Sequence, residues 1–559
     1  MGGRAGETVR AQPVERAIVT QQHGMECGKK ARSVATWLNL LQRRDSALRK
    51  RMEQICGGHP QAIETRLQQY ETALNEFNRL HGEKAEVVLV RSPARINLMG
   101  VHVEHRGGWV NYMAISREIA LVAQRREDDA VQLSNVDKAF EPRSFRIGQE
   151  LPADQRGDWL AYLDRSSVVP GDWGNYVKAA VLCLQSVLAD RALKGMNLVA
   201  IGDIPQSAGL SSSSALVVAS LEAALWANGL TLTPEEKVQV GGDGEWYVGT
   251  RGGAGDHAAM IFGKRDIIAH TRFFPLVVEP VPFPQGYRVI ACDSLKEARK
   301  AAGAKSIFNG RIAAYEIGLL LVKERFPQYA ERLTHLRDLN VEHLGVDEGR
   351  IYEILKALPQ TMTRREALAA LPEHSDKLET LFATHDAPQE GYSVRDVCLF
   401  GLAESDRGKV TADLLRAGKI KEFGELMYRS HDGDRLVSWM DGKPVPWDSH
   451  ATDACLDGLV EASRSRDPAI RQSARLCFQP GGYRCSCREL DLLVDIAKNV
   501  PGVAGAGLTG GGLGGAVLVL VREEHVGDLV EAVKREYYEP RRLPLSTEVC
   551  LPVEGAGLI

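Results

Sequence analysis

Apolar residues recur at helical spacing between about Ala31 and Met52. They form one stripe, with arginines on the other face. Ala62 to His81 repeats the pattern. Such spacing is typical of amphipathic helices that cover a neighbouring core. The pattern therefore predicts a helical N-terminal part, which we interpret as a packing appendage.

Beyond Ala85 the period of the pattern changes. Short apolar runs indicate strands, and longer stretches with helical spacing alternate with them. The predicted strands are Glu86 to Arg91, Ile119 to Gln124, Met196 to Gly202 and Gly515 to Val521. The predicted helices are Asn175 to Ser186, Ser213 to Asn228, Leu490 to Asn499 and Val526 to Tyr537, with a charged, Leu-rich helical region over 325–390. This alternation indicates a mixed α+β fold.

Composition excludes several classes of protein. The 559 residues carry a net charge of -4, so neither a nucleic acid nor a membrane surface is the expected partner. No stretch reaches the ~18 apolar residues of a membrane-spanning helix, and residues 1–24 look flexible, without a secretory signal. The ten cysteines are scattered, which favours reduced thiols and a cytoplasmic location. Nothing in the sequence indicates an obligate protein partner.

One segment carries an evident chemical signal. Pro205-Gln-Ser-Ala-Gly-Leu-Ser-Ser-Ser-Ser-Ala215 follows a predicted strand and leads into a predicted helix. Small residues let a ligand approach the backbone, and the free N–H groups at a helix start favour a phosphate. The segment is neither a Walker A loop nor a dinucleotide fingerprint. A Ser-rich loop with an ordinary helix cap is the simpler alternative.

Three segments in order resemble the motifs of GHMP kinases, and of galactokinases among them. Pro205 to Ala215 is similar to the phosphate-binding motif. Arg91 to Gly108, with Arg-Ile-Asn-Leu-Met-Gly followed by Val-His-Val-Glu, resembles the galactokinase signature. Gly505 to Gly515 resembles the glycine-rich loop that closes over the phosphates. The resemblance spans about Glu71 to about Pro552.

The resemblance implies a two-lobed GHMP fold. The expected parts are a helical extension (1–70), an N-terminal lobe like domain 2 of ribosomal protein S5 (71–300), and a ferredoxin-like C-terminal lobe (301–559) with the helical insertion near 325–390. ATP and Mg²⁺ are the implied cofactors, bound between the lobes.

The resemblance also implies a catalytic pair. Asp256, in Gly249-Thr-Arg-Gly-Gly-Ala-Gly-Asp-His257, matches the aspartate that accepts the proton of a sugar hydroxyl. Arg95 matches the signature arginine, which would lower the pKa of that aspartate and offset charge on the transferred phosphoryl group. An Asp after glycines is otherwise an ordinary turn residue.

The same motifs imply the nucleotide and metal residues. The ATP-binding set is Pro205, Gly209, Leu210, Ser211, Ser212, Ser213, Gly511 and Gly512. Ser212 and Glu245 are the candidate Mg²⁺ ligands, although Glu245 is one residue out of the family's register. Asp243 is the alternative acid.

The sugar-binding candidates are His102, Glu104, Gly253 and Phe308, and here the sequence departs from the galactokinase pattern. Val101 stands where the family has a carboxylate that contacts the exocyclic hydroxymethyl group. Phe308 replaces a tyrosine. A substrate without that group, or an acidic sugar paired with Arg106 or Arg251, therefore remains as open as galactose.

The sequence thus predicts an ATP-dependent sugar 1-kinase of galactokinase type, with galactose or a related sugar as substrate. One alternative is a kinase for L-arabinose, fucose or a uronic acid. Another is a non-catalytic sensor that binds ATP and sugar. A non-sugar alcohol as acceptor is a third, which the signature and the glycine turn disfavour.

Overall fold

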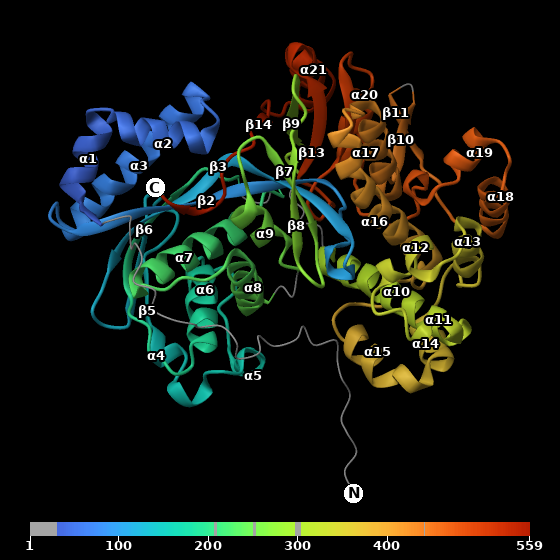
Figure 1. Cartoon of the computed structure of the whole chain (residues 1–559), viewed down its shortest axis with the longest axis horizontal. Coiled ribbons are helices and arrows are strands. Elements are labelled where there is room, and N and C mark those ends of the chain that lie inside the picture. The colour runs from blue at the N-terminus through green and yellow to red at the C-terminus, as the bar shows by residue number, and fades with distance from the viewer. Residues whose placement is uncertain (1–30, 206–208, 250–252, 297–302, 441) are drawn as a thin grey trace, which may run out of the picture.

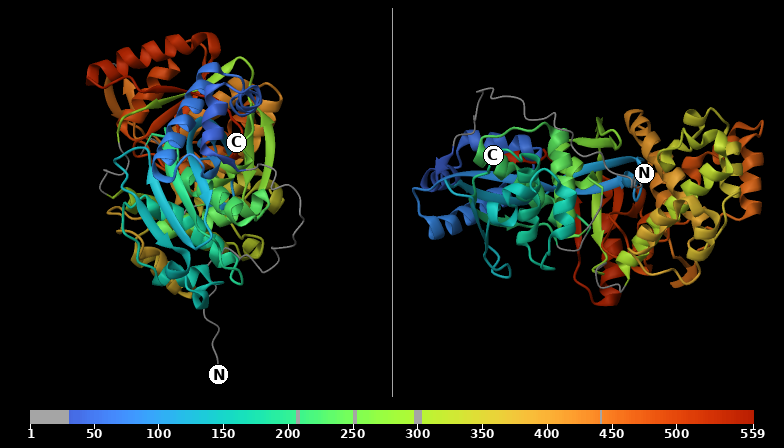
Figure 2. Two further views of the ribbon diagram at one scale, coloured as in Figure 1. Left: turned by 90° about the vertical axis from the view of Figure 1, so that its left-hand side faces the viewer. Right: turned by 90° about the horizontal axis from the view of Figure 1, so that it is seen from below.

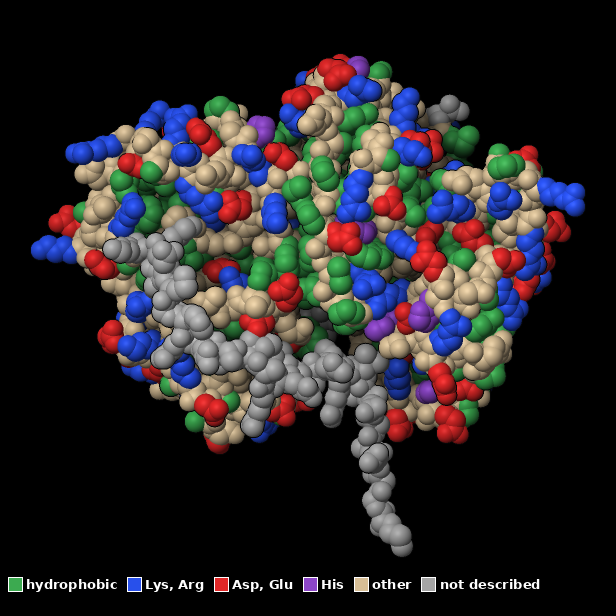
Figure 3. All heavy atoms as spheres, in the orientation of Figure 1, with side chains coloured by type: hydrophobic (Ala, Val, Ile, Leu, Met, Phe, Trp, Pro, Cys, Tyr) green, Lys and Arg blue, Asp and Glu red, His purple; other side chains and the backbone are tan. Residues whose placement is uncertain are grey.

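Two lobes lie side by side along the long axis of the molecule (Figures 1 and 2). The structure is a computed structural model that describes residues 31–205, 209–249, 253–296, 303–440 and 442–559. Residues 1–24, expected to be flexible, and Arg251 lie outside these ranges. No helix within them is long and apolar enough to cross a bilayer. On the face drawn in Figure 3, acidic and basic side chains are interspersed.

The N-terminal lobe is built on a nine-stranded, mainly antiparallel sheet with the order β1-β2-β3-β6-β4-β5, to which β15, β7 and β8 are added. Its strands are β1 (Arg32–Ser33), β2 (Glu86–Met99), β3 (Trp109–Arg125), β4 (Ala130–Asn135), β5 (Arg143–Arg146), β6 (Met196–Gly202), β7 (Ile267–Arg272), β8 (Val277–Pro282) and β15 (Gly557–Leu558). The sheet is helix-covered on both faces, which is why β2 begins as a continuous apolar run. Val88 and Val90 of β2 pack toward one helical layer, and Val87 and Leu89 toward the other.

Helices form these two layers. The first layer contains α4 (Ile147–Glu150), α5 (Trp159–Arg165), α6 (Gly174–Val187), α7 (Ser212–Asn228), α8 (Pro234–Glu245) and α9 (Gly255–Phe262). The second consists of α1 (Val34–Gln42), α2 (Ser46–Cys56) and α3 (Pro60–His81). The prediction of one helical pattern from Ala31 to Met52 is wrong in detail, because Asp45 interrupts it. The Asp45 carboxylate accepts hydrogen bonds from the N–H groups of Ala47 and Leu48 at 3.0 Å, which caps α2.

The N-terminal helices are joined to the sheet by buried polar contacts as well as apolar ones. The Tyr70 hydroxyl of α3 donates to Glu118 of β3 at 2.5 Å, and Arg91 of β2 donates to the same carboxylate at 2.6 Å. Because α3 continues through Tyr70 to His81, the expected boundary at residue 70 falls inside a helix.

The C-terminal lobe contains a four-stranded antiparallel sheet of order β12-β13-β9-β14. Its strands are β9 (Tyr287–Asp293), β12 (Val503–Leu508), β13 (Ala516–Arg522) and β14 (Thr547–Cys550). Helices α20 (Arg488–Lys498) and α21 (Val526–Val533) cover one face, and α16 (Val394–Arg416) and α17 (Ile420–Asp434) the other. Strand β9 precedes residue 300, so this sheet takes one strand from the segment expected to be N-terminal lobe.

The remaining helices form an outer layer of the C-terminal lobe. They are α10 (Ala304–Arg325), α11 (Pro327–Ala330), α12 (Val341–Leu344), α13 (Glu348–Lys356), α14 (Arg364–Ala370), α15 (Ser375–Phe382), α18 (Asp453–Ser463) and α19 (Pro468–Ser473), beside a small hairpin of β10 (Val437–Met440) and β11 (Lys443–Pro446). A separate apolar cluster joins β2, β3 and α9 of one lobe to α16, α17 and the sheet of the other.

Close packing of α17 on β12 depends on two glycines. A Cβ added to Gly424 would lie 1.9 Å from the carbonyl oxygen of Ala504, and one added to Gly505 would lie 2.5 Å from Gly424. Gly505 therefore serves helix–sheet packing, although it belongs to the predicted glycine-rich phosphate motif.

We predict that Gly424→Ala destabilises the protein by about 1–3 kcal/mol, because the added methyl group must push α17 off the sheet. Gly458→Ala, inside α18 with no atom within 4 Å of the new Cβ, is the matched control. It should be neutral or stabilising by up to about 1 kcal/mol. Urea unfolding of both variants measures this, and equal midpoints would contradict it.

Candidate active site

The side chains of the predicted catalytic pair form a bidentate ion pair. Arg95 lies in β2, and Asp256 lies in the first turn of α9. The Arg95 Nε and Nη2 atoms donate to the two carboxylate oxygens of Asp256 at 2.6 and 2.7 Å. The third nitrogen of the guanidinium, Nη1, donates to the carbonyl oxygen of Gly209 at 2.5 Å. One side chain thus joins the signature strand, α9 and the Ser-rich loop.

This contact sets the charge of Asp256. Burial pushes the pKa of the carboxyl upward, but the Arg95 guanidinium and the Ser211 hydroxyl outweigh it and hold the pKa below its ordinary value. Asp256 is therefore an ionised carboxylate that can accept a proton. About a quarter of its side chain (27%) remains exposed, so a substrate can reach it.

The Ser-rich loop runs from β6 to α7, as the pattern predicts. Ser211 adopts a left-handed conformation (φ 58°), and its hydroxyl donates to Asp256. No side chain caps the start of α7 within the described residues, so the first N–H groups of this helix are available to an anion. Ser212 and Ser213 are half-buried, Pro205 is exposed, and Leu210 is buried in the core between the lobes.

The glycine-rich loop after β12 lies against the Ser-rich loop. A Cβ on Gly510 would be 3.3 Å from the carbonyl oxygen of Gly209. Gly512 (φ 76°) lies so close to Cys485 that a Cβ would overlap its carbonyl oxygen at 2.0 Å, and a Cβ on Gly511 would meet the Phe308 ring. The structure thus brings together the two loops that sequence assigns to phosphate.

The candidate metal ligands lie beside the Ser-rich loop. Glu245 accepts a hydrogen bond from the hydroxyl of Ser214 at 2.7 Å, and its carboxylate is 3.2 Å from His257 Nε2. Burial raises the pKa of Glu245, but His257 outweighs it and the net direction is downward. Asp243, the alternative, instead accepts from Gln239 of its own helix at 2.7 Å. Within the described residues no group of three or more His, Cys, Asp or Glu gathers as a metal site.

These residues fit Mg²⁺ that is bound mainly through a nucleotide. Such an ion takes one or two protein oxygens and obtains the rest from phosphates and water. One ionised carboxylate beside the Ser214 hydroxyl, near the start of α7, meets that requirement.

The predicted sugar-binding residues surround the same pair. Glu104 lies against Gly253, where a Cβ would be 2.8 Å from its Cγ atom. Burial raises the pKa of Glu104, opposed in part by His102 and Arg95. His102 is buried with φ 64°, and its ring stacks on Tyr483 at 4.3 Å and lies 6.1 Å from Phe308.

The Arg106 guanidinium already contacts two residues of α10. Its guanidinium is 3.1 Å from Glu316 and donates to the carbonyl oxygen of Ile312. These contacts leave less of its charge for a uronate carboxylate, and the expectation that Arg106 could bind an acidic sugar stays a prediction.

A buried ion pair that sequence reasoning missed holds the signature turn. Glu404 of α16 accepts the N–H groups of Gly100 and Val101 at 2.8 and 3.0 Å, and Arg407 donates to it at 2.7 Å. Both charged side chains are fully buried. Glu404 and Arg407 are three residues apart on one helix, a spacing that favours an ion pair. The neighbouring sequence, however, does not show that the pair is buried.

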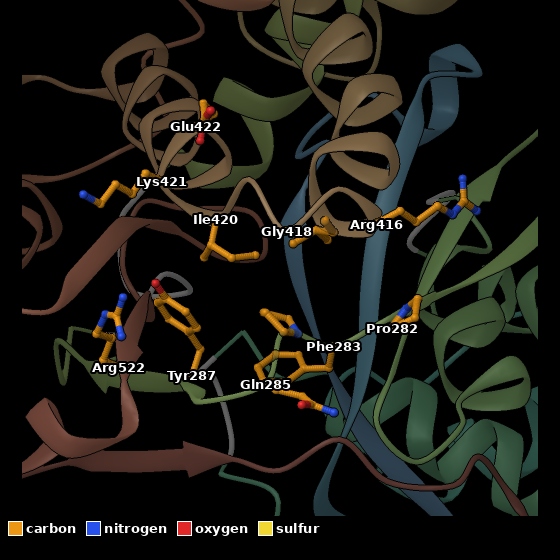
Figure 4. A pocket seen from close by; sticks show the side chains of 12 residues that line it. Pro282, Phe283, Gln285, Tyr287, Arg416, Gly418, Ile420, Lys421, Glu422 and Arg522 are labelled. Carbon is orange, nitrogen blue, oxygen red and sulfur yellow. The ribbon is translucent and has the colours of Figure 1, made fainter.

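A cavity of about 720 Å³ lies elsewhere, between the end of β8, the α16–α17 turn and β13 (Figure 4). Phe283, Tyr287, Lys421 and Arg522 are among its lining residues. It contains none of the predicted site residues, so the candidate active site is the Arg95–Asp256 region.

Comparison with known proteins defines the class. Residues 175–264 match the family described as GHMP kinases N terminal domain, and residues 461–539 match GHMP kinases C terminal. The chain thus carries both GHMP kinase domains in the order that the sequence predicts, and its mixed α+β architecture agrees with the predicted GHMP fold. Residues 75–125 match the galactokinase galactose-binding signature.

Several curated relatives are named galactokinases. The galactokinase of Dictyostelium discoideum is 24% identical, over 85% of this chain and 89% of that protein. The galactokinase of Chloroflexus aurantiacus is 27% identical, over 84% and 92%. The structure of Lactococcus lactis galactokinase complexed with galactose superposes with a TM-score of 0.60 at 23% identity, covering 86% of this chain and 97% of that one.

We predict that Arg95→Met destabilises the fold by about 2–3 kcal/mol at pH 7, because Asp256 is left as a mostly buried, unpaired carboxylate. Arg95 is the main group that lowers the pKa of Asp256 against the effect of burial, so this pKa should be higher in the variant than in the parent. The loss in free energy of unfolding, relative to the parent protein, should therefore be largest at pH 7. It should decrease as the pH falls and the carboxyl takes up a proton.

The double variant Arg95→Met/Asp256→Asn should recover at least half of this loss, since no unpaired charge remains. Urea unfolding between pH 5 and pH 7 measures all three proteins. A single variant as stable as the parent, or a deficit independent of pH, would show that the ion pair does not control this site.

Proposed function

We propose that the protein is an ATP-dependent galactokinase, which transfers the γ-phosphoryl group of ATP to the anomeric hydroxyl of galactose and releases sugar 1-phosphate and ADP. The observation that carries the proposal is the Arg95–Asp256 ion pair, which lies where the signature strand, the Ser-rich loop and the glycine turn before α9 meet. The named relatives support galactose over the alternatives.

Asp256 accepts the proton of the anomeric hydroxyl as the sugar oxygen bonds to phosphorus and the bond to the ADP oxygen breaks. Arg95 keeps Asp256 ionised and lies where negative charge develops. Phosphoryl transfer depends mostly on positioning and charge neutralisation, so this pair needs no covalent intermediate.

The phosphates of ATP lie between the two loops in this proposal. The uncapped N–H groups at the start of α7 and the backbone of Gly209, Gly511 and Gly512 bind them. Pro205, Leu210 and Ser211 to Ser213 shape that loop. Mg²⁺, when bound, neutralises phosphate charge, and Ser212 and Glu245 would hold it.

The sugar binds between His102, Glu104, Gly253 and Phe308, each of which lies near the catalytic pair or the glycine-rich loop. A uronic acid is not favoured because Arg106 is paired. A sensor is not favoured because Asp256 and Arg95 are both in place. In this proposal residues 71–300 form the N-terminal lobe with the sugar and ATP motifs, except that β9 joins the C-terminal sheet, and residues 301–559 form the C-terminal lobe, except that β15 returns to the N-terminal sheet.

The free cysteines support a cytoplasmic location. The nine in the described residues are all unpaired, and eight of them are buried.

We predict that a coupled ADP-release assay with Mg²⁺-ATP detects turnover with galactose, and that Asp256→Asn lowers kcat by about 10²–10⁴-fold. The isosteric change removes the proton acceptor and leaves nucleotide binding intact, which a fluorescent ATP analogue reports. Asp266→Asn, at a side chain 69% exposed, is the matched control and should keep full activity.

No turnover with galactose, L-arabinose, fucose, glucuronate or galacturonate, while ATP still binds, would contradict the kinase and favour the sensor. Turnover that survives Asp256→Asn would contradict the assigned base.

A further inference from the structure

The histidine of the predicted sugar site faces a carboxylate that the sequence did not suggest. His102 Nε2 lies 3.4 Å from the Oδ2 atom of Asp434, the last residue of α17. Asp434 is fully buried, and its other oxygen accepts the N–H of Cys485 at 3.1 Å. The turn that carries His102 supplies no such group at position 101, where Val101 is apolar and buried.

Unsatisfied polar atoms gather around this pair. Within the described residues Tyr315 Oη and His105 Nε2 are buried without a hydrogen-bond partner, and His102 Nε2 and Asp434 Oδ2 have no partner besides each other. Their rings are neighbours: Tyr315 is 5.8 Å from Tyr483, on which His102 stacks, and 6.2 Å from His105. Buried polar atoms rarely remain unpaired, so this cluster indicates a place that a polar ligand completes.

The order of the charged groups in the site indicates which part of the sugar the His102–Asp434 pair would face. Glu104 lies against Gly253, three residues before Asp256, and follows His102 by two residues, and the His102 imidazole lies 3.4 Å from Asp434. The sequence of groups is therefore Asp256, Glu104, His102, Asp434. If the anomeric hydroxyl lies at Asp256, then His102 meets the side of the ring that carries the other hydroxyls, remote from the transferred phosphoryl group.

We propose that Asp434 is a positioning residue that orients the His102 imidazole toward a galactose hydroxyl remote from the anomeric carbon. The carboxylate holds Nε2 as a donor and leaves Nδ1 for the sugar. A carboxylate behind a histidine fixes its tautomer and ring orientation in this way. The inference rests on the proposed function, since it assumes that a sugar occupies the site.

The test is a double-mutant cycle that combines a variant of Asp434 with deoxy analogues of the sugar. Asp434→Asn keeps the shape of the side chain and removes its charge. It should raise KM for galactose about tenfold to a hundredfold, the range for a hydrogen bond to a charged group, with kcat changed less than about twofold. Glu425→Gln is the matched control on the same helix, where the Glu425 side chain is exposed. It should leave both constants unchanged.

The second arm uses 3-deoxy-, 4-deoxy- and 6-deoxygalactose. With the sugar that lacks the hydroxyl facing His102, Asp434→Asn should have no further effect on KM, because the contact is already absent. A loss that is equal for galactose and all three deoxy sugars, or that falls on kcat alone, would overturn the proposal and leave Asp434 a structural residue.

Calorimetric binding of the same sugars separates this inference from the proposed function. If the parent protein binds galactose without turning it over, the kinase is wrong and the cycle is read from Kd instead. If it binds and phosphorylates galactose but shows no coupling, only the role of Asp434 is wrong. If it binds none of these sugars, both proposals fail.

Discussion

The ion pair of Arg95 and Asp256 is the interaction on which the rest of this site depends. A charge withdrawn from water must find a partner, and here one guanidinium satisfies both oxygens of a carboxylate and a carbonyl of the Ser-rich loop. The pair therefore keeps the proton acceptor ionised and fixes three segments that are far apart in sequence. Its position at the meeting of the loops makes it a centre for chemistry as well as for packing.

The C-terminal lobe completes this centre from the other side. Glu404 and Arg407 hold the turn after β2 by its backbone, and the Gly510 region touches Gly209. A shared apolar cluster joins both sheets across the junction. Residues beyond 553 return to the N-terminal lobe, where β15 pairs with β2 and the backbone of Glu554 and Gly555 accepts from Arg91.

Local signals in the sequence predicted the parts that local chemistry determines. The strand, Ser-rich loop and helix over 196–228 were predictable because an apolar run, small residues and a second apolar run follow each other directly. Arg95 and Asp256 were found through motif register, and the structure places them in contact. The break between α1 and α2 was missed although Asp45 is an ordinary cap residue.

Features that depend on distant segments were not predictable. Nothing in Tyr287–Asp293 says that it pairs with strands beyond residue 500, because β9 looks like any buried strand. The burial of Glu404 and the approach of Asp434 to His102 arise only when the lobes pack. The hydroxyl beside Glu245 belongs to Ser214 and not to Ser212, a difference of helix phase that spacing alone does not resolve.

The position of the phosphate in the product tests the role of Asp256 most directly. Proton-coupled ³¹P NMR of the reaction of galactose with ATP distinguishes an anomeric phosphate ester from one on the exocyclic carbon. We expect a single sugar phosphate, whose phosphorus is coupled to the anomeric proton, with ADP formed in equal amount. A phosphate on any other carbon, or inorganic phosphate alone, would contradict the role assigned to Asp256.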